Sequence, residues 1–170
     1  MTLFEHYRSI DAAFTLASAG TGLAALGAAF LCSTAITLMH EFAHLVAARC
    51  FGLRGRLAFF ALRGKSRVWF FNIMAANFDE AESFAIGAGR LRVVIASGPV
   101  CHTALTVLCL YMGLSLQGPA WLGLGVALAG AIYAPISLLN FIPLPFGTDG
   151  WRLLWPITEE MRAASQRSRP

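Results

Sequence analysis

The sequence predicts a mainly α-helical membrane protein, with three core transmembrane helices and a small β-hairpin or sheet between the first and the second. Of the 170 residues, 57% are hydrophobic and only 13% are charged, which is too little charged surface for a soluble domain. Residues 12–39 and 93–148 contain no Asp, Glu, Lys or Arg. Because about 20 apolar residues span a bilayer, the first stretch holds one span and the second holds two, divided near Gln117. We predict helices near 22–48, 91–114 and 120–142.

The basic residues lie mainly on one side of these spans. Eight of the thirteen fall between the first and the second span, four follow the third, and only Arg8 precedes the first. Lys and Arg are enriched in cytoplasmic loops. We therefore expect a multi-pass protein of the cell membrane, with residues 49–92 and the C-terminus in the cytoplasm. Topology accounts for the net charge of +4, so no nucleic-acid partner is expected.

The chain is expected to form one membrane core with a short segment at each end. The third span is rich in small residues, which suit close packing between membrane helices. These are Gly123, Gly125, Ala127, Gly130 and Ala131. The expected parts are an interfacial lead-in at 1–21, the core at 22–155 and a cytoplasmic tail at 156–170.

The segment between the first two spans has its own structure. Two apolar, aromatic-rich runs, 57–62 and 68–73, flank the sequence Arg-Gly-Lys-Ser, a pattern typical of a β-hairpin. Asn77 or Asp79 then caps a predicted short helix that includes residues 80–82.

The first span ends in His40-Glu41-Phe42-Ala43-His44, the pattern H-E-x-x-H. Residues i and i+4 lie on one face of a helix, so both imidazoles could bind one Zn²⁺. Glu41 would then serve as the general base that activates a water molecule. Ionisable groups inside an apolar span are costly and mark functional sites. The alternative is a buried polar cluster that only links helices.

Asp149 is the expected third ligand, because a catalytic zinc site usually has three protein ligands and one open position. If the first span runs inward, it ends on the cytoplasmic side, and so does the third, which Asp149 follows. Pro143, Pro145 and Gly147 interrupt a regular helix just before it, and broken backbone at membrane depth is tolerated where it is buried or lines a wet cavity. We therefore expect one Zn²⁺ per chain, bound by His40, His44 and Asp149.

Three motifs occur in one order along residues 22–155. The H-E-x-x-H helix is followed by Ser97-Gly98-Pro99, and then by Asn140-x-x-Pro143-x-Pro145 with Asp149-Gly150. In this combination the sequence resembles the site-2 proteases, which are intramembrane zinc metalloproteases of regulated intramembrane proteolysis.

The resemblance implies an endopeptidase that cuts a membrane-spanning or membrane-tethered protein in or near a transmembrane segment. It implies that His40, His44 and Asp149 bind zinc and that Glu41 activates water. It also implies a role for Asn140 beside the scissile peptide, as a donor to the oxyanion. Members of this family have a sheet between their first two core helices. One use for the predicted hairpin is to bind the substrate in an extended form at an exposed sheet edge; the other is to cover the site.

Several alternatives stay open. Family members often carry Asn three residues after the Gly-Pro proline, where this chain has His102. His102 is either a further metal-capable residue or a histidine that packs beside the site. The chain could also be a catalytically inactive, structural or regulatory membrane subunit with the same fold, or a diiron or zinc lipid-modifying enzyme. The sequence also leaves open a homo-oligomer and an accessory membrane partner.

Overall fold

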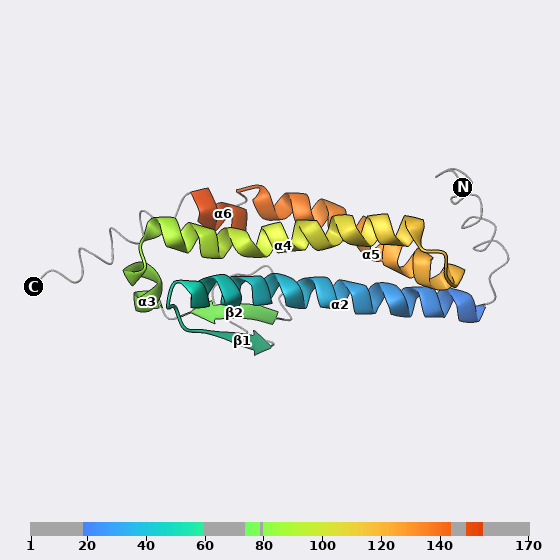
Figure 1. The fold of residues 1–170 in the computed structure, drawn as a ribbon, viewed down its shortest axis with the longest axis horizontal. Helices are drawn as coiled ribbons and strands as arrows, with labels where there is room; N and C mark the ends of the chain where they lie inside the picture. Colours follow the sequence, from blue (N-terminus) through green and yellow to red (C-terminus); the bar gives the residue numbers. More distant parts are fainter. Residues whose placement is uncertain (1–18, 60–73, 79, 144–148, 155–170) are drawn as a thin grey trace, which may run out of the picture. The chain divides into compact units, whose positions relative to one another are not determined.

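The structure is a computed structural model, and it describes residues 19–59, 74–78, 80–143 and 149–154. Most of these residues are helical, and one small antiparallel sheet accompanies the helices (Figure 1). In chain order the elements are α2 (Ala19–Cys50), β1 (Gly55–Phe59), β2 (Met74–Phe78), α3 (Glu80–Ala85), α4 (Ala88–Ser115), α5 (Ala120–Phe141) and α6 (Asp149–Leu154). By length and composition, α2, α4 and α5 are able to cross a membrane, which confirms the three predicted helices.

Large apolar side chains lie on the outside of the three long helices. Leu23, Phe30, Tyr111 and Leu138 are 70%, 70%, 69% and 69% exposed. By contrast, the buried positions of α5 are mostly glycine, alanine, valine and serine. A water-soluble protein rarely exposes apolar surface on this scale, whereas lipid chains are a suitable surrounding for it.

The chain forms two compact units, and each long helix contributes to both. The first comprises Met1–Ile36 and Thr103–Ser137, and the second comprises Thr37–His102 and Leu138–Pro170. In the first unit the helices meet at small residues. A Cβ added at Gly125 of α5 would lie 2.6 Å from the Cβ of Ala28 in α2, so only glycine permits this approach. The predicted close packing is confirmed here, although Ala131 is exposed.

The second unit contains the sheet. β1 pairs with β2 in an antiparallel register from Gly55–Phe78 to Phe59–Met74. The first predicted run overlaps β1 at residues 57–59, and the second lies outside the described residues. The short helix α3 is present as predicted. Asn77 lies in β2 and does not cap it, while Asp79 is outside the described part of the chain.

The end of α2 is fixed by a glycine turn. Gly52 has a φ of 76°, its N–H donates to Arg49 O at 3.0 Å, and the N–H of Leu53 donates to Ala48 O at 2.9 Å. These two bonds form the motif that commonly ends a helix at a left-handed glycine. Leu53 is 1% exposed and forms a buried cluster with Ala48 and Val94 of α4. This cluster holds the last turns of α2 against α4, next to the H-E-x-x-H residues.

Candidate metal site

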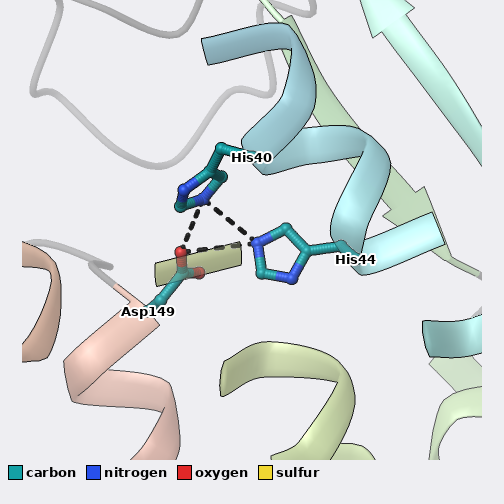
Figure 2. Close-up of side chains that lie close together, drawn as sticks. All are labelled: His40, His44 and Asp149. Carbon is teal, nitrogen blue, oxygen red and sulfur yellow. Dashed lines mark hydrogen bonds and ion pairs between the residues drawn. The ribbon is translucent and has the colours of Figure 1, made fainter. Parts of the chain in front are cut away.

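His40, His44 and Asp149 lie close together, with their ring and carboxylate atoms converging on one point (Figure 2). Nε2 of His40 lies 3.0 Å from Oδ2 of Asp149 and 3.2 Å from Nε2 of His44. Nε2 of His44 lies 3.5 Å from the same carboxylate oxygen. The two histidines are only 7% and 6% exposed. The structure therefore brings together the three residues that the sequence predicts as metal ligands.

These separations fit a tetrahedral metal ion. Two nitrogen or oxygen ligands at zinc bonding distance lie about 3.3 Å apart in a tetrahedral site, and the three observed distances run from 3.0 to 3.5 Å. Two imidazoles and one carboxylate also match the donor set of a catalytic zinc site. The group could thus hold a metal ion through three protein ligands.

The orientation of His44 supports the same conclusion. Its Nδ1 lies 2.7 Å from the carbonyl oxygen of Val94 in α4. A neutral imidazole that donates from Nδ1 presents a lone pair at Nε2, which is the atom that faces His40 and Asp149. Metal-binding histidines are commonly oriented by such a bond to a backbone carbonyl. His40 differs, because its buried Nδ1 has no hydrogen-bond partner among the described residues.

Asp149 is positioned by the start of α6 and is ionised. Burial alone would raise its pKa, but the close contacts of the carboxylate with the His40 and His44 rings outweigh burial and hold the pKa of this carboxyl below its usual range. The next residue, Gly150, packs tightly on the end of α5: an added Cβ would lie 2.6 Å from Ile142 O and 2.6 Å from the carbonyl carbon of Phe141. The glycine thus lets α6 begin directly against α5.

One face of α4 lines the two imidazoles. Val94, Gly98 and His102 are spaced four residues apart and so share this face. A Cβ at Gly98 would lie 2.8 Å from Nε2 of His40 and would come still closer to the His44 ring. His102 is 4% exposed, and its ring packs edge-on to His40 with centroids 5.4 Å apart. His102 therefore lies beside His40 and outside the group of three ligands.

Glu41 has a partner that the sequence does not reveal. The backbone N–H of Ala76 in β2 donates to Oε2 of Glu41 at 2.6 Å. The carboxylate is partly buried and is not one of the three converging ligands. Its assignment as the general base stays a prediction.

Asn140 lies in the last turn of α5 and is partly buried. Among the described residues, no hydrogen bond joins it to the three ligands, so its role beside a scissile peptide also stays a prediction. Sequence reasoning missed the carbonyl of Val94 and the N–H of Ala76, because every residue offers these backbone groups. The role of Gly98 had a signal, since the Gly-Pro motif singled this residue out.

No protein-family model, curated protein or solved structure matches this chain. The resemblance to the site-2 proteases thus rests on the three sequence motifs. The case for a metal-binding site rests on the geometry of His40, His44 and Asp149.

Proposed function

We propose that this chain is an intramembrane zinc endopeptidase, similar to the site-2 proteases, which hydrolyses a peptide bond in or near a transmembrane segment of a membrane protein. One observation carries the proposal: His40, His44 and Asp149 converge within 3.0–3.5 Å, with both histidines buried and Asp149 partly buried. Both histidines lie on α2, which is long and apolar enough to cross a bilayer. A metal site on a helix within the bilayer would have access to peptide bonds that soluble proteases do not reach.

The side chains would divide the reaction between them. A bound Zn²⁺ would supply a Lewis acid that polarises the scissile carbonyl and makes a water molecule more acidic. Glu41, next to His40 on α2, would take a proton from the attacking water and deliver it to the leaving amine. The amide of Asn140 would donate a hydrogen bond to the oxyanion that develops on the substrate.

The sheet offers a way to present the substrate. A peptide bond inside a helix is shielded by the hydrogen bonds of its own backbone, so the segment has to become extended before it is cut. An extended peptide can add to the edge of a sheet as a further strand. The bond between Ala76 and Glu41 places β2 within reach of the H-E-x-x-H helix. The alternative use of the sheet is to cover the site.

A second candidate function is a membrane subunit that keeps the fold without catalysis. The bond from Ala76 N–H to Glu41 favours it, because this bond gives Glu41 a structural role that needs no hydrolysis. A diiron lipid-modifying enzyme is less well supported. Within the described ranges, a single group of three side chains could hold a metal ion, and two irons require more ligands.

Metal analysis and cleavage assays on one pair of proteins separate these functions. The wild type and Glu41→Gln, which preserves the size of the side chain, are purified and reconstituted with membrane proteins that accumulate when the active protein is removed from cells. We expect one zinc per chain in both proteins and cleavage by the wild type alone. No metal would favour the structural subunit, and two irons would favour the lipid enzyme. Equal cleavage by both proteins would refute the role of Glu41.

A further inference from the structure

The edge of β2 that faces away from β1 carries the hydrogen bond to Glu41. In an antiparallel pair, successive residues alternate between those bonded to the partner strand and those that face away from it. Ala76 lies opposite Leu57 of β1, but its N–H donates to Glu41. The N–H of Ala76 therefore faces away from β1. By the same alternation, the N–H groups of Ala75 and Asn77 face β1.

The carboxylate of Glu41 lies at the edge of β2 where a further strand could pair. An unpaired strand edge presents N–H groups that another chain can use, and no described strand pairs with β2 on this side. At 2.6 Å, the bond to Oε2 of Glu41 is short, and hydrogen bonds from a backbone N–H to a carboxylate are among the stronger ones in proteins. Glu41 thus accepts from Ala76 where the carbonyl of an added strand would accept.

We propose that the N–H of Ala76 positions Glu41 in the free protein, and that an extended peptide pairing with β2 takes over this N–H and releases the carboxylate. This inference rests on the proposed function for its catalytic consequence: the base becomes available only when a peptide lies on β2. The same exchange of partners would restrict the substrate to an unwound segment. An intact helix has its carbonyl groups bonded internally and cannot replace Glu41, whereas an unwound segment offers free carbonyl groups.

Hydrogen exchange at the amide of Ala76 tests the resting contact without zinc or turnover. In the wild type this amide should exchange slowly, and Glu41→Ala should speed its exchange by about ten- to a hundredfold, the loss of one bond to a charged acceptor. Glu41→Gln retains a neutral acceptor and should fall between them. The amides of Ala75 and Asn77, which face β1, are internal controls and should not change. Equal exchange at Ala76 in all three proteins would overturn the proposal.

Peptide binding tests the exchange of partners. The probe is a short fluorescent peptide of alternating valine and threonine, titrated into each purified protein. Glu41→Ala should bind it about tenfold more tightly than the wild type, because the N–H no longer has to leave a carboxylate. Ala76→Pro removes the shared N–H and no bond to β1, so it should bind more weakly, and adding Glu41→Ala to it should bring no gain.

Equal affinity of the wild type and Glu41→Ala for the peptide would overturn the exchange of partners. These experiments distinguish a failure of the protease proposal from a failure of the proposed exchange at Ala76. Absence of zinc and of cleavage would refute the protease, while exchange at Ala76 and peptide binding would still report on the contact between Glu41 and β2.

Discussion

Gly98→Ala is expected to weaken zinc binding strongly, although Gly98 is not a ligand. The new Cβ would lie 2.8 Å from Nε2 of His40, whereas ordinary contacts of a Cβ begin at 3.4 Å, so this nitrogen would have to shift by about 0.6 Å and the His44 ring by more. Zinc tolerates deviations of only about 0.2 Å in ligand distance. The helices cannot easily separate, because the buried cluster of Leu53 and Val94 holds α4 to the end of α2. We expect a loss of zinc affinity of at least about a hundredfold, the upper end for disturbed outer contacts of a ligand.

Gly89→Ala is the matched control, since Gly89 lies in the same helix and an added Cβ there would meet nothing within 4 Å. This variant should therefore fold as the wild type does and should bind zinc normally. The assay is competition with a chromophoric chelator, together with thermal unfolding of both variants. Wild-type zinc affinity in Gly98→Ala would refute the close approach of α4 to the two imidazoles.

Three further predictions test the remaining assignments. Asp149→Ala deletes a ligand and should lose zinc in metal analysis; full occupancy would instead make His102 the next candidate ligand. Asn140→Ala should keep its zinc while cleavage of a reconstituted substrate falls by about a hundredfold to a thousandfold, as for loss of one oxyanion donor; loss of zinc would contradict this role. A cysteine probe at Gln117 should react with an impermeant reagent from outside and one at Gly64 should not, and the reverse result would refute the orientation that the basic residues predict.

The long helices and the ligand group could be predicted from the sequence because each has a strong local signal. Uncharged stretches of this length have few structural solutions other than a membrane span. His40 and His44 share a helix face by their spacing alone. Asp149 needed a further argument, from topology and from the prolines before it. The structure brings its carboxylate to the two rings, and this is the part of the site where the sequence argument was least direct.

The position of β2 was not predictable in the same way. The sequence Met-Ala-Ala-Asn-Phe of β2 has one aromatic and no β-branched residue, so it lacks the composition that favours strands. The aromatic run just before it, residues 68–73, was the segment predicted as the second strand. A bond from Ala76 to a side chain of α2 helps to hold β2 in place, and a contact between residues 35 positions apart leaves no trace in the local pattern.

The face of α4 explains why motifs far apart in the chain belong to one site. Three residues on successive turns of this face contribute to the site in different ways. The carbonyl of Val94 orients His44, Gly98 leaves space for both imidazoles, and the ring of His102 packs against His40. An H-E-x-x-H pattern that arose by chance would not be expected to face a helix position that lacks a side chain. Gly98 has no side chain and so no chemistry of its own, yet both rings depend on it. The Gly-Pro motif is therefore informative because it meets a requirement of packing, and the ligand motifs are informative because they meet a requirement of coordination.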